Sequence, residues 1–363
     1  MKRKVYFFII FLFIGLLVIP AFNIFSEKNI NSTHWRKKSF LYNIDFTLKW
    51  ASFILYRFGM STDPKQVIVG KNGWFFLGDA YEYTLTEARR APTDADHLLA
   101  KKIAVTAEGW ASDLSNQGVK VFKIMVGPNK GTIYPEYMPA WARPFSPGVT
   151  DVLFEAVGSN HYLDLRPALL EFKANNPEPI YYKTDTHWNF LGASIAFREF
   201  SRQIAKEAPE ILWPQPEWFQ VDRKEIRYGG DLATFLRLSD QLPDFEPILR
   251  LSTVSINTTL RDFDSQTIVG QGGNPALSSP TKPLWVQSRG ALNLKRVLWL
   301  RDSFGTAISP WMAATFSDVL QVHWGEVIGH PGRLSQLVDR WKPDYVFITV
   351  VERAARNEAF AVR

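Results

Sequence analysis

The chain has 363 residues, of which 46% are hydrophobic, 14% aromatic and 21% charged, a balance typical of a folded globular protein that excludes an intrinsically disordered chain. The formal net charge is +6, but Lys2, Arg3 and Lys4 supply three of those charges, and no basic run or arginine stripe follows them. We therefore expect no binding to nucleic acid.

The chain contains no cysteine. Disulfide bonds, a thiol nucleophile and thiolate metal ligands are therefore excluded. A domain without cysteine also avoids mispaired disulfides in an oxidising compartment outside the cytoplasm.

Residues 5–25 form an uncharged, apolar run of 21 residues directly after the basic cluster. As a helix this run would be about 31 Å long, enough to cross a bilayer core with the basic end in the cytoplasm. A cleaved signal peptide has a shorter apolar core and small residues at its cleavage site, and Ile19-Pro-Ala-Phe-Asn23 lacks that pattern. We expect residues 1–28 to be a retained anchor, followed by an aromatic, basic stalk at 29–66, with a cleaved signal as the alternative.

The rest of the chain, residues 67–363, is predicted to be one domain. It begins with a hairpin over 67–77 that turns at Asn72-Gly73. Helices are then expected at 94–117, 150–157, 189–207, 306–315 and 333–341, and strands at 119–126, 161–165, 296–300, 319–323 and 344–350. Strands separated by helices favour a three-layer α/β/α fold with a mostly parallel sheet. Residues 214–292 are rich in Pro, Gly, Ser and Thr and are interpreted as a β-rich insertion.

The segment Lys183-Thr-Asp-Thr-His-Trp-Asn189 places a carboxylate and an imidazole two residues apart. A serine hydroxyl becomes a useful nucleophile when an imidazole takes its proton and a carboxylate orients that imidazole. Ser303, which follows a short apolar strand, is the natural complement to Asp185 and His187. Ligands of such sheets sit at the carboxyl ends of strands, where we also expect Asn129. The pattern predicts acyl transfer through a covalent ester.

Other interpretations of these residues remain open. Asp185 could cap the following helix while His187 is a buried structural histidine, and His323 or His330 could serve as the base instead. A zinc site needs three or four ligands, and Asp185 with His187 supplies only two, so no metal is expected. No glycine-rich phosphate-binding motif occurs, so no nucleotide cofactor is expected either.

Further short motifs accompany the Asp185/His187 pair along the chain. They are Lys71-Asn-Gly-Trp-Phe75, Pro128-Asn-Lys130, Ile133-Tyr-Pro-Glu-Tyr137, Asp185-Thr-His-Trp188, Gly230-Asp-Leu232 and Asp302-Ser-Phe304. With them the chain resembles, from about Val69 to Val351, the exported SGNH hydrolase-like O-acetyltransferases of the alginate type, the AlgX and AlgJ family. The resemblance implies that Ser303 is the nucleophile, His187 the base and Asp185 the residue that orients it. The chain departs from many SGNH enzymes in having Arg301 where they carry glycine, and it has no Gly-x-Ser-x-Gly elbow.

The resemblance further implies a function and a location. The protein would be a single-pass protein of a bacterial inner membrane whose catalytic domain, in the periplasm, acetylates hydroxyls of an exopolysaccharide. The acetyl group would come from a membrane-bound O-acyltransferase partner, and no cofactor would be needed. A carbohydrate esterase with the same three residues, and a non-catalytic glycan-binding component, are the alternatives that the sequence leaves open.

Candidate residues for the oxyanion and the substrate complete the sequence-based picture. The oxyanion would be held by the backbone N–H of Ser303 together with Asn129 or a neighbouring amide, because a tetrahedral intermediate needs about two donors. The further candidates for oxyanion or substrate contact are Lys130, Tyr134, Trp188 and Arg301, and the rings of Tyr137 and Trp311 are added as glycan contacts.

Overall fold

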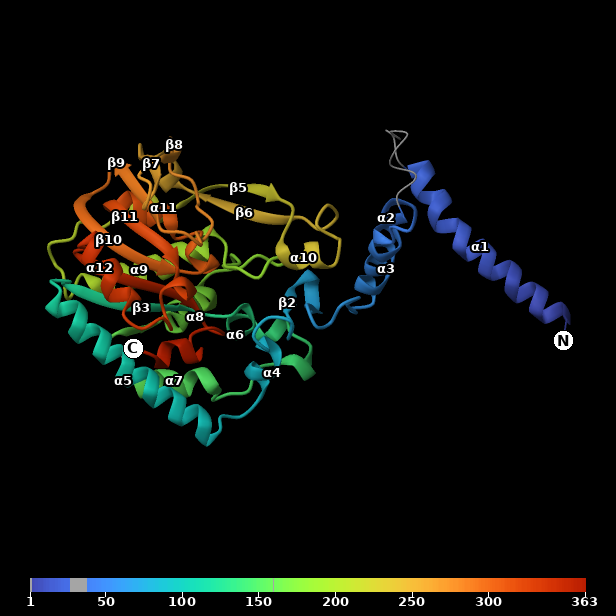
Figure 1. Ribbon diagram of the computed structural model, residues 1–363, viewed down its shortest axis with the longest axis horizontal. Helices are drawn as coiled ribbons and strands as arrows, with labels where there is room; N and C mark the ends of the chain where they lie inside the picture. The colour runs from blue at the N-terminus through green and yellow to red at the C-terminus, as the bar shows by residue number, and fades with distance from the viewer. Residues whose placement is uncertain (1, 27–37, 159) are drawn as a thin grey trace.

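The computed structural model describes residues 2–26, 38–158 and 160–363 (Figure 1). The helices are α1 Lys2–Ser26, α2 Lys38–Leu41, α3 Asp45–Arg57, α4 Thr84–Arg89, α5 Asp94–Asn116, α6 Lys130–Ile133, α7 Val149–Val157, α8 Arg166–Asn175, α9 Phe190–Ile204, α10 Asp231–Phe235, α11 Ser309–Thr315 and α12 Arg333–Trp341. The strands are β1 Val67–Val69, β2 Phe75–Leu77, β3 Val121–Gly127, β4 Tyr162–Asp164, β5 Val221–Arg227, β6 Asp244–Leu249, β7 Asn257–Asp262, β8 Ile268–Gln271, β9 Leu284–Arg289, β10 Asn293–Arg301, β11 Phe316–His323 and β12 Tyr345–Val351.

Eight strands form the main sheet, in the order β4-β3-β12-β10-β11-β9-β7-β8. The five strands from β4 to β11 are parallel, whereas β9, β7 and β8 continue the sheet in antiparallel pairs. The prediction of a mostly parallel sheet is therefore corrected: the sheet is mixed. The reason lies in the connections, because β7 and β8 are joined by only a few residues, too few for the crossover that a parallel pair needs.

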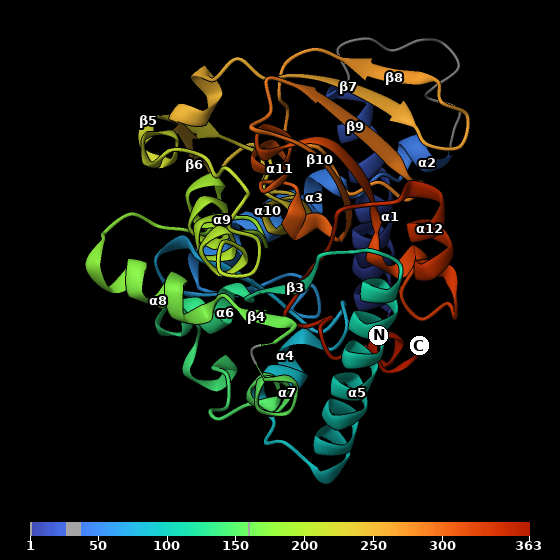
Figure 2. The same ribbon diagram turned by 90° about the vertical axis from the view of Figure 1, so that its left-hand side faces the viewer.

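The parallel strands are buried on both faces. Every residue of β3 and β12 is buried, which explains why both strands are apolar without alternation, apart from Lys123 and Thr349. Helices α5 and α12 cover one face of the sheet, and α9 and α11 cover the other (Figure 2). The helices and strands predicted in this part of the chain are present, with boundaries shifted by a few residues.

The segment 214–292 is rich in strands, as predicted, and its strands divide between two places. β7, β8 and β9 extend the main sheet, while β5 and β6 pair only with each other in a separate two-stranded sheet. Short α10 lies between β5 and β6 in the chain. This arrangement carries the end of β5 and the start of α10 towards the loop that holds Asp185.

The sequence did not predict α8, and this changes where the Asp185/His187 loop begins. That loop connects α8 to α9 and follows no strand of the main sheet, which corrects the expectation that it lies at a strand end. An isolated antiparallel bridge between Tyr181 and Trp188 holds the two ends of the loop together. Gly192 allows this packing, since a Cβ there would lie 2.1 Å from the carbonyl oxygen of Ile180.

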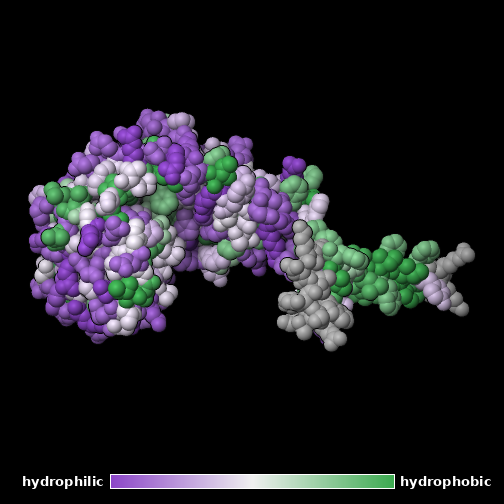
Figure 3. Space-filling model, turned by 90° about the horizontal axis from the view of Figure 1, so that it is seen from above, coloured by the Kyte–Doolittle hydropathy of each residue, from purple (hydrophilic) through white to green (hydrophobic). Residues whose placement is uncertain are grey.

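The N-terminal part of the chain stands apart from the body formed by residues 67–363 (Figure 1). Among the described residues, one helix is long and apolar enough to cross a membrane, from Val5 to Phe25, with a mean hydropathy of 2.8. Figure 3 shows its hydrophobic surface beside a largely hydrophilic body. The side-chain amide of Asn23 donates to three carbonyls at residues 40, 41 and 43, which fastens α1 to α2. Residues 27–37 of the predicted anchor and stalk lie outside the described residues.

Candidate active site

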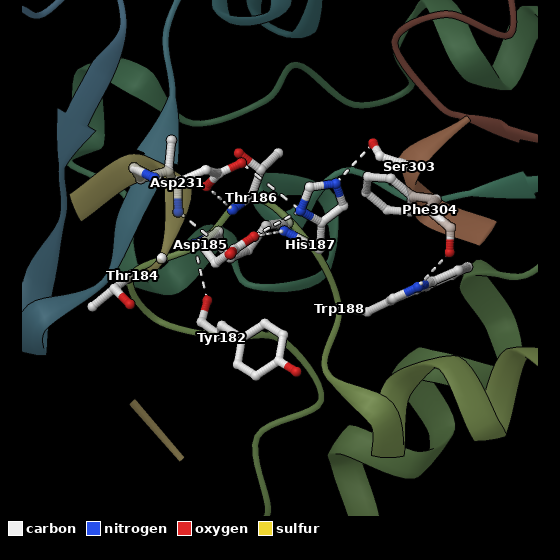
Figure 4. A network of polar contacts seen from close by, with 12 residues as sticks. Tyr182, Thr184, Asp185, Thr186, His187, Trp188, Asp231, Ser303 and Phe304 are labelled. Atoms are coloured by element: carbon white, nitrogen blue, oxygen red, sulfur yellow. Dashed lines mark hydrogen bonds and ion pairs between the residues drawn. The ribbon is translucent and has the colours of Figure 1, made fainter. Parts of the chain in front are cut away.

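Three polar side chains form a hydrogen-bonded chain at one edge of the main sheet (Figure 4). Nδ1 of His187 lies 2.7 Å from Oδ1 of Asp185, and Nε2 of His187 lies 2.8 Å from Oγ of Ser303. Ser303 is exposed and follows the carboxyl end of β10. The structure thus brings the predicted nucleophile within direct reach of the predicted base, the geometry that proton transfer between them requires.

The carboxylate of Asp185 is buried and hydrogen bonded at both oxygens. Oδ1 also accepts the backbone N–H of His187 at 3.0 Å, and Oδ2 accepts Nη2 of Arg227 at 2.9 Å. Burial alone would raise the pKa of this carboxyl, but the bonds from His187 and Arg227 outweigh it and hold the pKa well below its usual range. Asp185 is therefore an anion at neutral pH, and it can hold Nδ1–H so that Nε2 faces Ser303.

The imidazole of His187 has two acidic neighbours. Burial lowers its pKa, but the hydrogen bond and charge of Asp185, together with the charge of Asp231, raise the pKa above the ordinary histidine value. Oδ2 of Asp231 lies 3.8 Å from Nδ1 of His187. A histidine with a raised pKa is a stronger base once it is neutral, which suits the removal of a hydroxyl proton.

Asp302 ties the turn that carries Ser303 to the sheet. Its Oδ1 accepts the backbone N–H of Phe304 at 2.9 Å, and its Oδ2 accepts the backbone N–H of Val351 at 2.7 Å. From the other side, Nε1 of Trp188 donates to the carbonyl of Phe304 at 3.0 Å. The turn that carries Ser303 is therefore fixed both to the end of β12 and to the loop that carries His187.

Lys130 lies inside the protein, where it cannot contact a substrate. Its Nζ donates to the backbone carbonyls of Tyr182, Lys183 and Asp185, at 3.0, 3.1 and 2.6 Å. Burial lowers the pKa of Lys130 to about 8, although the charges of nearby carboxylates oppose the shift. The sequence-based assignment to the substrate is thus replaced by a structural role: Lys130 holds the loop that presents Asp185.

Arg301 is also buried, and its guanidinium is engaged in hydrogen bonds within the protein. Nε donates to the side chain of Gln321 at 2.7 Å, and Nη2 donates to the carbonyls of Leu277 and Ser278 at 2.8 and 2.9 Å. Burial lowers the pKa of Arg301 to about 9. Its expected contact with substrate is therefore not what the structure shows, and the residue instead joins β10 to the loop before β9.

The aromatic residues proposed for glycan contact lie mainly in the core. Trp188 is 1% exposed and Trp311 is fully buried. Tyr134 is buried as well, and its hydroxyl accepts the backbone N–H of Ile180 at 3.0 Å. Tyr137 is half-buried and stacks on a neighbouring tryptophan. Since three of these four rings are enclosed by protein, packing explains their presence and a glycan platform does not.

Asn129 begins α6 at the carboxyl end of β3 and has a fixed side chain. Its backbone N–H donates to Oε2 of Glu352 at 2.7 Å, and its Oδ1 accepts Nη1 of Arg353 at 3.3 Å. Because arginine can only donate, this contact assigns the oxygen end of the amide to Arg353 and leaves Nδ2 as the free donor end. Arg353 is itself held by Glu82, with Nε 3.4 Å from Oε2. The amide of Asn129 therefore keeps a donor available for the oxyanion role, which stays a prediction.

The sequence analysis did not single out Arg227, Asp231, Glu82 or Arg353 as residues of the site. Only Asp231 had a signal, since it sits in the Gly230-Asp-Leu232 motif. Its Oδ1 accepts the backbone N–H of Thr186 at 2.7 Å. Gly230 allows this approach, because a Cβ there would lie 2.3 Å from the carbonyl oxygen of Thr184. The others come from distant segments and carry no local pattern.

A second carboxylate brings the site close to a metal-ligand set. Ligand atoms of Asp185, His187 and Asp231 all lie within 4.8 Å of one another. Several of these atoms are already engaged: Arg227 pairs with Asp185, two backbone N–H groups bond to Oδ1 of Asp231, and His187 bridges Asp185 to Ser303. Oδ2 of Asp231 faces Nδ1 of His187 at 3.8 Å.

The alternative bases do not contact Ser303. Nδ1 of His323 accepts the backbone N–H of Gly325 at 3.0 Å, and the ring stacks on Trp324. His330 lies in the loop before α12, beside the end of α5. The geometry therefore favours His187 as the partner of the serine.

Comparison with known families finds one match, to the family described as SGNH hydrolase-like domain, acetyltransferase AlgX, over residues 67–276. This range covers more than half of the chain, including Asp185 and His187, and ends before Ser303.

Curated relatives point the same way. The chain is 27% identical over 275 residues to a probable alginate O-acetylase AlgJ of Pseudomonas syringae pv. tomato, covering 70% of this chain and 67% of the relative. It is 24% identical over 273 residues to the probable alginate O-acetylase AlgJ of Pseudomonas fluorescens, covering 69% of this chain and 63% of the relative. The chain thus spans about two thirds of the length of these relatives.

A solved structure shares the fold. PatB1 of Bacillus cereus superposes with a TM-score of 0.58 at 14% identity, over 81% of this chain and 98% of that one. At this level of identity the likeness concerns the arrangement of the chain alone.

Proposed function

The chain belongs to the SGNH hydrolase-like AlgX acetyltransferase family, and we propose that it is an O-acetyltransferase acting on hydroxyls of an exopolysaccharide through an acyl-enzyme on Ser303. One observation carries this proposal: the unbroken chain of hydrogen bonds from Asp185 through His187 to the exposed hydroxyl of Ser303. The names of the relatives support acetylation of alginate or a similar polymer as the purpose of that chemistry.

In the first half-reaction Ser303 accepts the acetyl group. Nε2 of His187 takes the hydroxyl proton while Oγ forms a bond to the carbonyl carbon of the donor. The oxyanion that develops is held by the backbone N–H of Ser303 and by Nδ2 of Asn129. The intermediate then collapses, His187 returns the proton to the leaving group, and an acetyl ester on Ser303 remains.

In the second half-reaction a sugar hydroxyl takes the acetyl group. His187 removes the proton of that hydroxyl, and the sugar oxygen bonds to the ester carbonyl. The bond between the carbonyl carbon and Oγ breaks, and Oγ regains a proton from His187. Asp185 stays ionised in both halves and stabilises the imidazolium that forms each time.

We further propose that residues 1–28 are a retained anchor and that the rest of the chain, from the stalk onwards, lies in the periplasm of a bacterium. The support is the length and composition of the run from Val5 to Phe25 and the basic residues before it. A membrane-bound O-acyltransferase would supply the acetyl group, because an anchored enzyme can receive it at the membrane surface.

The experiment is a turnover assay on the full chain in detergent. The protein is given an activated acetyl ester and a panel of acidic and neutral bacterial oligosaccharides, and products are followed by mass spectrometry beside Ser303→Ala. We expect acetylated sugar from the wild type and a rate lower by about 10⁴-fold or more from the variant. Acetate without acetylated sugar would support an esterase instead, and equal rates from both proteins would exclude Ser303 as the nucleophile.

A further inference from the structure

Helix α3 carries a stripe of large apolar side chains that are exposed to solvent. Phe46, Trp50 and Ile54 are spaced four residues apart and therefore form one stripe, which we term the outer face of α3. Their exposed fractions are 43%, 54% and 48%. Phe58, just after the helix, is exposed as well. A contiguous apolar stripe of this kind is uncommon on a surface that meets only water.

The opposite face of α3 is fixed to the protein. Oγ of Ser52 lies 2.8 Å from Oγ1 of Thr62, and the ring of Tyr56 packs edge-on against Phe75 of β2. Asp45, at the start of the helix, pairs with Nε of Arg237 at 3.0 Å. Since the inner face is held in this way, the outer face stays exposed in the described structure.

The outer face of α3 continues the apolar surface of α1. Phe22, near the outer end of α1, stacks on Phe46 with ring centroids 4.0 Å apart. In Figure 1, α3 lies beside that end of α1, between it and the catalytic body. If α1 spans the bilayer, the outer face of α3 therefore starts at the level of the membrane surface.

The charges around α3 complement a membrane. Among the described residues 38 to 57, three are basic, Lys38, Lys49 and Arg57, and one, Asp45, is acidic. Of the three, Lys49 is paired with Asp240. Basic residues flanking an apolar stripe with a tryptophan are typical of helices that lie in the interface of anionic bilayers. An apolar hollow beside the stripe, lined by Phe46, Lys49, Trp50, Phe53 and Gln241, offers room for part of an acyl chain.

We propose that the outer face of α3 lies on the lipid bilayer as an interfacial helix, a second membrane contact besides α1. This inference rests on the proposed anchor. Its consequence is orientation: the inner face of α3 packs on the small apolar cluster that includes Leu232 of α10, and Asp231 of α10 contacts the His187 loop. Docking of α3 thus holds the active site at a fixed height above the membrane, where the acetyl group arrives.

The absence of cysteine makes a direct test possible, because one introduced thiol can be labelled alone. A nitroxide is placed at Ile54→Cys in the full chain, reconstituted into vesicles of phosphatidylglycerol and phosphatidylethanolamine. Collision rates with oxygen, which partitions into lipid, and with a water-soluble nickel chelate give the depth of the label. The matched control is Val105→Cys, on the exposed side of α5. We expect an oxygen-to-nickel ratio several-fold higher at residue 54 than at residue 105.

A third label, at Leu16→Cys within α1, separates the two proposals. If residue 16 lies in lipid but residue 54 has the same ratio as residue 105, the interfacial helix is wrong and the anchor stands. If residue 16 is in water, the anchor is wrong, and the interfacial helix that rests on it is wrong as well. In a third outcome, the label at residue 54 is exposed to water on vesicles and becomes shielded from both reagents only after a membrane protein is added. That result would show that the outer face of α3 binds a protein and does not lie on lipid.

Discussion

Asp231 is the residue that distinguishes the acid–base pair of this site from an isolated Asp and His. It adds a second negative charge beside His187, and with Asp185 it raises the pKa of the imidazole despite the opposing effect of burial. His187 acts as a base only when neutral, so activity should be lost as the pH falls through this raised pKa. The acid limb of the pH profile of kcat/KM should therefore lie above the ordinary histidine value of about 6.5.

Asp231→Asn removes that charge, and the acid limb should move to lower pH. The measurement is kcat/KM against pH for the wild type and the variant. Asp339→Asn, an exposed position on α12, serves as the control and should leave the limb in place. An unchanged limb in Asp231→Asn would show that this carboxylate does not act on His187.

A second prediction at the scale of single residues concerns Asn129 and Arg353, whose side chains are hydrogen bonded to each other. Asn129→Ala removes one proposed oxyanion donor, for which we expect kcat to fall by about 10²-fold or more with KM little changed. Arg353→Met leaves the amide of Asn129 in place but unheld, so the loss in kcat should be smaller. Arg353→Lys, which keeps a donor for Oδ1, should restore part of it.

Steady-state kinetics on the three variants separate kcat from KM, and Arg340→Met, at an exposed ion pair with Asp264, controls for loss of charge. A rise in KM with kcat intact would instead make Arg353 a substrate-binding residue.

At the scale of elements, the loop from residue 180 to 189 depends on its neighbours more than on its own sequence. It has no regular secondary structure beyond one bridge, and Nζ of Lys130 donates hydrogen bonds to three of its backbone carbonyls. Lys130→Met keeps the length of the side chain but leaves these carbonyls without their donor. We expect a loss in the free energy of unfolding of at least about 2 kcal/mol, and a lower kcat because Asp185 is less well held.

The free energy of unfolding is measured by denaturant titration, together with kcat. Lys183→Met is the matched control, since this lysine is in the same loop and only weakly bonded to the carbonyl of Asn72, at 3.4 Å. It should change stability by less than about 0.5 kcal/mol. Equal stability of the two variants would mean that the carbonyls find other donors.

The buried parallel strands could be predicted, whereas the antiparallel extension and α8 could not. β3, β12 and the second half of β10 are mainly apolar, so their own residues predict strands buried on both faces. The strands β7 to β9 mix polar and apolar residues, and which sheet they join depends on the packing of β9 against β11. α8 has an apolar stripe that is too short to be separated from a loop by periodicity alone.

At the scale of the whole molecule, the lack of cysteine gives a chemical prediction. A thiol reagent such as iodoacetamide should leave activity unchanged, because the chain offers it no thiol. A serine-directed sulfonyl fluoride should inhibit and add its mass to the peptide that contains Ser303, since His187 activates that hydroxyl. The measurement is peptide mass spectrometry after each reagent, with His187→Ala as the control that should label slowly. Labelling of a different serine would place the nucleophile elsewhere.

The sequence by itself determined the features that depend on neighbours along the chain. A 21-residue apolar run is long enough for a membrane whatever follows it, alternating strand and helix patterns favour an α/β core, and Asp185 with His187 two residues later is a local pair. Only the tertiary structure decided that Ser303, 116 residues away, meets Nε2 of His187.

The tertiary structure also decided which charged and aromatic side chains are buried. Lys130, Arg301 and Trp188 have residue types that suit a binding site, yet they are enclosed because the segments packed over them supply carbonyls and rings as partners. Burial and contact between distant segments are properties of the packed chain, whereas periodicity and spacing are written in each segment. For this reason the chemistry of the site could be predicted before its supporting residues.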